Sequence, residues 1–384
     1  MVCLSCIICL IAYHALSLET GGGRMTKKRI GIYLLLTFAL TWGVMLPFFL
    51  LGGSYENPAV HFVLTYSMLC PAIAVLITRK VTGEGWAVTG KDSLMLGLDL
   101  KNKKWIWFVL ALVGPIVYLD LGDLLFYGMF PQAFDPDALA ALGVPRKLLF
   151  LLPFSGISNA VMLCFGALGE EIGWRSYLYP KLESVFGTTK ALLLGGVIWG
   201  IWHYPAICGG HGFGHGYFGE PWTGFLVFTI DTLATGTLLF YVTKKTQSVW
   251  AAAFLHAANN TFSGGTILAL SYSDKHLTGI ALQSPFRLFL MGIPVSILAV
   301  IVWRRMLRVP AAGSPRRRRP VRPAVPARPH PRRRSAQSPP HAVRFLLPAD
   351  PVFPSSSSLH SHLCINVPII TDSSLFSMPR RTRG

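Results

Sequence analysis

Two adjacent glutamates in an apolar stretch are the residues best suited to chemistry. Glu170 and Glu171 are followed by Arg175 in the run ALGEEIGWR. Positions i and i+4 share a face of a helix, so we expect Glu171 and Arg175 to form an internal ion pair that supports the site. Glu170 lies about 100° away with no basic residue at that spacing. We interpret Glu170 as the reactive carboxylate; a charged helix end at the membrane surface is the structural alternative.

Two later apolar segments each carry a histidine. Trp199 precedes His203 by one helical turn and is expected on the same face. His256 and Asn260 are also one turn apart, among alanines that allow close helix packing, and Asn259 points elsewhere. Ionisable and amide groups inside a membrane usually serve function, so these residues are candidates for the same site as Glu170.

A carboxylate and two imidazoles that converge in a dry cavity have a definite chemical use. Glu170 can take a proton from water, and His203 can orient that water or hold a metal. His256 and Asn260 can donate hydrogen bonds to the oxyanion of an attacked amide. The residues therefore predict hydrolysis of a peptide bond at or within a membrane.

The elements that position these residues are membrane helices. Of 384 residues 52% are hydrophobic and 14% charged, and the mean hydropathy is +0.48. Apolar blocks of this length predict an all-α fold, a polytopic membrane helical bundle of about eight transmembrane helices. The expected spans are 30–52, 59–78, 105–130, 150–178, 190–208, 222–242, 247–263 and 285–303. Basic residues accumulate in alternate loops, which predicts that both termini are cytoplasmic.

The depth of each residue along its helix tests whether the groups can meet. At about 1.5 Å per residue, His203 lies roughly 20 Å beyond Lys190 and His256 roughly 17 Å beyond Lys245, so the two histidines agree in depth. Glu170 joins them if its span starts after Pro153, and we adopt that arrangement.

The two ends of the chain differ from the body. Residues 1–24 are apolar but short and lack a preceding basic residue, so we interpret them as an extension that is not native, with Met25 as the natural start. Residues 25–308 form the membrane domain. The tail 309–384 is rich in Pro, Arg and Ser and is expected to be disordered. Most of the net charge of +18 lies in this tail, so it does not predict nucleic-acid binding by the body.

The three motifs carry a family resemblance over roughly residues 30–305. EExxxR at Glu170 to Arg175, an aromatic residue four before His203, and HxxxN from His256 to Asn260 resemble the CPBP family. This family comprises type II CAAX prenyl endopeptidases and bacteriocin-processing enzymes, also called Abi or Rce1-like proteases. The second motif more typically has Phe where this chain has Trp199.

The resemblance implies an intramembrane glutamate-dependent endopeptidase in a prokaryotic plasma membrane. Glu170 would activate water with His203, while His256 and Asn260 stabilise the oxyanion and Glu171, Arg175 and Trp199 support them. Zinc held by Glu170, His203 and His256 is an alternative, but HExxH is absent and we expect no metal and no other cofactor. The expected partners are membrane lipids and a peptide or lipidated-protein substrate, prenylated or bacteriocin-like.

Two other classes of function stay open. A non-catalytic immunity protein would keep the same fold. An ion-coupled transporter would use the intramembrane carboxylates Asp120, Asp123 and Asp231, although the sequence has no internal repeat. His211 and His215, in a Gly-rich loop, could bind a metal, but a flexible loop is the simpler interpretation.

Overall fold

The computed structural model describes residues 22–55, 57–90, 92–143 and 146–308. These residues form helices and turns with no strand, and an isolated bridge joins Phe134 to Tyr272. The all-α fold expected from the hydropathy is therefore confirmed. Most of the expected extension 1–24 and the whole of the expected disordered tail 309–384 lie outside the described residues.

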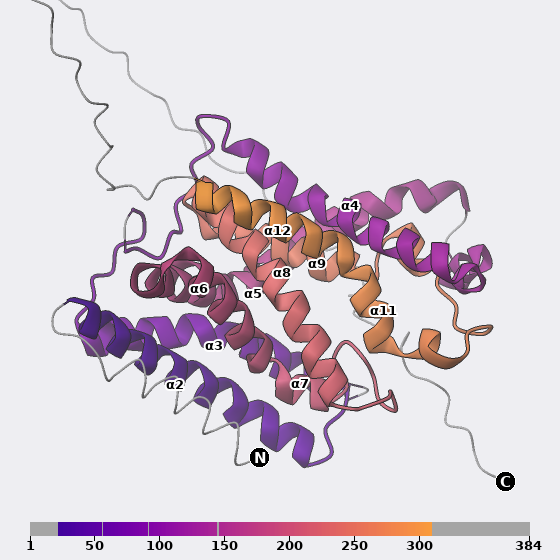
Figure 1. Cartoon of the computed structure of the whole chain (residues 1–384), viewed down its shortest axis with the longest axis horizontal. Coiled ribbons are helices and arrows are strands. Elements are labelled where there is room, and N and C mark those ends of the chain that lie inside the picture. The colour runs from indigo at the N-terminus through magenta and orange to yellow at the C-terminus, as the bar shows by residue number, and fades with distance from the viewer. Residues whose placement is uncertain (1–21, 56, 91, 144–145, 309–384) are drawn as a thin grey trace, which may run out of the picture. The chain divides into compact units, whose positions relative to one another are not determined.

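Each of the eight expected spans corresponds to a helix (Figure 1). These helices are α2 (Gly22–Leu50), α3 (Ala59–Thr82), α4 (Trp105–Met129), α5 (Leu152–Glu171), α6 (Tyr179–Trp202), α8 (Trp222–Thr246), α9 (Val249–Phe262) and α12 (Ile293–Arg308). Short helices connect them: α7 (Tyr204–Cys208), α10 (Ile267–Leu270), α11 (Ser284–Met291) and the 3₁₀ turns Pro131–Ala133, Pro136–Leu142, Arg146–Leu151 and Gly279–Leu282.

Five helical segments are long and apolar enough to cross a membrane, which makes the chain an integral membrane protein. One of them, Lys147–Trp202, contains two expected spans, and α11 with α12 forms a further candidate that is bent by 43°. Helix α9 has only 14 residues, fewer than the roughly 20 that cross a bilayer.

Helix α9 lies in the middle of the helix packing. It contacts α4, α5 and α8, while α6 packs on α8 and α2 packs on α3 (Figure 1). Its alanines at 251, 252, 253, 257 and 258 are almost completely buried. Small side chains let helix backbones approach closely, so the alanine-rich sequence explains the central place of this short helix.

The chain between α5 and α6 is wound as a π-helix. Residues Ile172–Leu178 form this π-turn, in which the N–H of Tyr179 bonds to the carbonyl of Trp174. A Cβ added at Gly173 would lie 2.3 Å from the Cβ of Pro71 and 2.6 Å from the hydroxyl of Tyr33. Only glycine allows this approach of the π-turn to α2 and α3. π-Bulges occur frequently at functional sites, and this one directly follows Glu171.

Candidate active site

Glu171 has two side-chain partners at the end of α5, an arginine and a histidine. Its Oε1 accepts from Nη1 of Arg175 at 3.0 Å and from Nδ1 of His256 at 2.8 Å. All three side chains are at most 6% exposed. The ion pair expected from the i and i+4 spacing is present, and it is joined by a histidine from α9 that the spacing did not predict.

Glu170 has a different partner. Its Oε2 accepts a hydrogen bond at 2.9 Å from the indole Nε1 of Trp199 on α6, and both side chains are buried. Within the described residues Glu170 forms no ion pair. The two neighbouring carboxylates therefore differ: Glu171 pairs with Arg175 and bonds to His256, whereas Glu170 accepts from a neutral donor.

His203 lies where α6 ends and the chain turns into α7. Its Nδ1 is 2.8 Å from the carbonyl oxygen of Trp199. Because a carbonyl only accepts, Nδ1 is the donor, and in the neutral ring Nε2 carries the lone pair. The end of α6 is fixed by α2, since Trp202 donates to Thr41 Oγ1 at 2.9 Å and Trp42 donates to the Trp202 carbonyl at 3.1 Å.

Besides Glu170, Trp199 contacts Arg175, His203 and His256. The guanidinium of Arg175 lies 4.1 Å above its ring. The ring centroids of His256 and His203 lie 5.4 Å and 5.7 Å from its own. The sequence suggested only that Trp199 shares a face with His203, and its contacts with Glu170, Arg175 and His256 come from long-range packing.

The two asparagines of α9 behave differently from each other. Asn259 is fixed, since its Oδ1 accepts from the hydroxyl of Tyr118 on α4 at 2.7 Å. Asn260, the residue selected from the sequence, is exposed, and its side chain makes no hydrogen bond to the described part of the chain. It follows His256 by one turn and is free to bond to a bound molecule.

Three hydrogen bonds fix the first turn of α9, the helix that carries His256. Ser248 caps the helix by accepting from the N–H of Trp250. The loop before α4 adds two bonds: the carbonyl of Met95 accepts from the N–H of Val249 at 2.9 Å, and that of Leu96 from Trp250 Nε1 at 3.1 Å. Caps of this kind contribute about 1 kcal/mol each.

The π-turn is anchored by Glu84, which follows α3. Glu84 Oε2 bonds to Lys181 at 2.8 Å, and its Oε1 lies 3.4 Å from Arg29 Nε and accepts from the hydroxyl of Tyr177. Burial raises the pKa of Glu84, but the bonds from Lys181 and Tyr177 outweigh it, so the pKa lies below the ordinary 4.5. Tyr177 and Lys181 flank the end of the turn that carries Arg175, and Glu84 ties both to α3. Glu84 has no local sequence signal, because Tyr177 and Lys181 lie 93 and 97 residues away from it.

The two histidines of the Gly-rich loop have different partners. His211 packs against His203, Phe228 and Tyr55, with ring centroids 6.2, 5.7 and 5.7 Å away. Burial lowers the pKa of His211 to about 4. His215 instead bonds to Glu220 at 2.8 Å.

Zinc is the metal alternative at the candidate site. The described residues contain no group of three or more His, Cys, Asp or Glu side chains arranged to hold a metal ion. Nδ1 of His256 bonds to Glu171 Oε1, which leaves Nε2 as the ring atom that could face a bound group. We derive no step through a metal.

The carboxylates considered for ion transport are scattered. Asp123 on α4 lies 3.9 Å from Arg287 on α11, with both side chains at most 9% exposed. Asp231 on α8 lines a separate cavity with Ser296 of α12. Asp123 therefore has a structural explanation, namely an ion pair between helices.

Two comparisons with known proteins identify the family of this chain. Residues 153–262 match the family described as type II CAAX prenyl endopeptidase Rce1-like. The chain is also 31% identical, over 265 residues, to CAAX prenyl protease 2 of Methanococcus maripaludis, covering 65% of this chain and 89% of that protein. The fold and the relatives define a membrane endopeptidase. The chain belongs to the Rce1-like CAAX prenyl endopeptidase family, and the matched region contains all three motifs.

Proposed function

We propose that the chain hydrolyses a peptide bond of a membrane-associated substrate and that Glu170 activates the water. The observation that carries this assignment is the contrast between the two carboxylates. Glu171 is occupied by Arg175 and His256, whereas Glu170 accepts from the neutral indole of Trp199. A carboxylate that is not neutralised by a cation is the better general base.

His203 is proposed to orient the attacking water. With Nδ1 donating to the carbonyl of Trp199, the Nε2 lone pair of the neutral ring is available to accept a hydrogen bond from water. The water would then donate one hydrogen to Glu170 and one to His203, which directs its oxygen lone pair at the carbonyl carbon of the substrate.

His256 and Asn260 are proposed to bind the oxyanion. An ionised Glu171 can only accept, so Nδ1 of His256 is a donor, and a ring that also donates from Nε2 must be positively charged. Glu171 is the counter-charge for that imidazolium. Two carboxylates, Arg175 and a charged His256 then give a buried cluster with no net charge, which lowers the cost of burying it.

The reaction balances within these residues. Glu170 removes a proton from water as the oxygen attacks, and the carbonyl oxygen becomes an oxyanion that accepts from His256 and Asn260. The protonated Glu170 then gives its proton to the leaving nitrogen as the C–N bond breaks. The products are a carboxylic acid and an amine, which exchange a proton to become a carboxylate and an ammonium ion, and Glu170 returns to its ionised form.

The substrate class follows from the relatives. The Methanococcus protein is named a CAAX prenyl protease, so we propose prenylated CaaX-type chains as substrates, with bacteriocin-like peptides as the alternative. The alternating loop charges support cytoplasmic termini, and we place the protein in a prokaryotic plasma membrane.

The test is cleavage of prenylated and unprenylated peptides by the detergent-purified full chain. Glu170→Gln should lose at least about a hundredfold in kcat, because general-base catalysis contributes roughly 10²–10⁴-fold. Glu183→Gln is the matched control, since Glu183 pairs with Lys244 at a partly exposed position. Loss of cleavage with a zinc chelator would overturn the metal-free mechanism. Equal turnover by wild type and Glu170→Gln would overturn the assignment and favour an immunity or transport function.

A further inference from the structure

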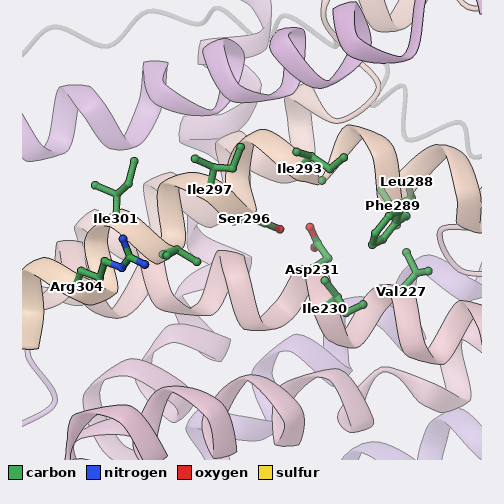
Figure 2. Close-up of a pocket in the computed structure, with 12 residues that line it drawn as sticks. Val227, Ile230, Asp231, Leu288, Phe289, Ile293, Ser296, Ile297, Ile301 and Arg304 are labelled. Carbon is green, nitrogen blue, oxygen red and sulfur yellow. The ribbon is translucent and has the colours of Figure 1, made fainter. Parts of the chain in front are cut away.

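A second cavity lies away from the candidate active site. It has a volume of about 490 Å³ and lies between α8 and the bent pair α11 and α12. Its wall is apolar except for the side chains of Asp231, Ser296 and Arg304, and it shares no residue with the candidate site (Figure 2). A cavity of this volume is within the range of roughly 300–1,000 Å³ that suits one small amphiphilic molecule.

The length of the cavity along α12 matches one leaflet of a bilayer. Ile293, Ile297, Ile301 and Arg304 recur at helical spacing on one wall (Figure 2). From Ile293 to Arg304 the helix rises about 16 Å at about 1.5 Å per residue. Half of the hydrocarbon core of a bilayer is about 15 Å thick. An acyl chain of one leaflet therefore fits along this wall when Arg304 lies at the membrane surface.

The charge at one end of the cavity indicates which head group would bind. Arg304 is exposed, and the described residues make no ion pair with it. The last turns of both helices are basic, with Lys244 and Lys245 in α8 and Arg308 in α12. Guanidinium groups bind phosphate oxygens in a bidentate manner, and clustered basic residues near a helix end attract anionic lipid.

We propose that this cavity binds an anionic membrane phospholipid, with one acyl chain along α12 and the phosphate on Arg304. The apolar wall between Ser296 and Arg304 contacts the chain. Asp231 and Ser296 face each other across the cavity about 12 Å deeper than Arg304, counted along α12 (Figure 2). A carboxylate at this depth disfavours a second anionic group, so the head group binds at the arginine end.

The test is lipid titration of the delipidated, detergent-purified full chain, followed by native mass spectrometry. Phosphatidylglycerol and phosphatidylcholine with identical acyl chains are compared. The wild type should retain phosphatidylglycerol preferentially. Arg304→Ala should weaken its binding by about tenfold, the equivalent of one charge-assisted hydrogen bond. Arg305→Ala is the matched control: it is exposed in the same turn but does not line the cavity, and it should change binding less than twofold.

A second variant separates the acyl chain from the head group. Ile297→Trp fills the middle of the cavity and should weaken both lipids, with an unchanged melting temperature as evidence that the protein is folded. Equal losses for Arg304→Ala and Arg305→Ala would overturn the site in favour of diffuse surface charge. Equal retention of the two lipids by the wild type, or unchanged binding in Ile297→Trp, would also overturn it.

Discussion

Replacing Trp199 with Phe isolates the contact that holds Glu170. The substitution keeps an aromatic ring beneath Arg175 and next to His256, but it removes the indole N–H that donates to Glu170 Oε2 at 2.9 Å. A hydrogen bond to a charged group contributes about 1.5–3 kcal/mol. If Trp199 keeps Glu170 aligned with the water in the transition state, this energy corresponds to a loss of about 10- to 150-fold in kcat.

The assay is steady-state cleavage of a peptide substrate at several concentrations, so that kcat and KM are separated. Trp199 contacts Glu170 rather than the substrate in our mechanism, so kcat should fall while KM stays within about twofold. Phe38→Leu, at a buried aromatic position of α2 outside the candidate site, controls for the loss of aromatic packing. A Trp199→Phe enzyme with wild-type kcat would refute the assignment of Trp199 as a positioning residue, because the substitution removes the donor to Glu170.

Three further predictions concern stability, each measured by thermal melting in detergent. Glu171→Gln leaves Arg175 buried without its counter-charge and should lower the free energy of unfolding by about 3–5 kcal/mol. Glu183→Gln removes a partly exposed ion pair and should lower it by at most about 1 kcal/mol. Equal shifts in melting temperature for the two variants would contradict the burial argument. Burial lowers the pKa of His211 from 6.5 to about 4, so below pH 6.5 the unfolded state binds more protons than the folded state. The free energy of unfolding should therefore fall between about pH 6.5 and 4, by at most about 3 kcal/mol. A His211→Gln protein with the same pH dependence would show that another group is responsible. Gly173→Ala should destabilise by more than about 1 kcal/mol because its Cβ overlaps Pro71, while Gly31→Ala, with nothing within 4 Å, should be neutral or stabilising.

The features that the sequence predicted well are those with local causes. Apolar blocks of membrane length specify helices because lipid offers no hydrogen-bond partner to the backbone, and each expected span corresponds to a helix. The pair of Glu171 with Arg175 follows from helical geometry alone. The start of the fourth span near Pro153 also follows from a local rule, since proline is tolerated in the first turn of a helix.

The features that the sequence did not predict depend on long-range packing. The bond of His256 to Glu171 joins residues 85 apart, and the bond of Trp199 to Glu170 joins residues 29 apart. The π-turn after Glu171 has no local signal, because its cause is the fit of Gly173 against α2 and α3. His211 was expected in a flexible loop because glycines surround it, and its packing against His203 depends on where α7 and α8 place that loop.

The roles proposed for the two glutamates follow from the positions of their partners, Arg175, His256 and Trp199. Adjacent carboxylates disfavour each other's ionisation, so a buried pair is tolerable only if at least one is neutralised. Arg175 reaches Glu171 from the same chain segment, and His256 reaches the same oxygen from α9. Both bonds converge on Oε1 of Glu171, and Glu170 is left with the neutral donor of Trp199. In the proposed mechanism Glu170 therefore has no cationic partner and is available as the general base.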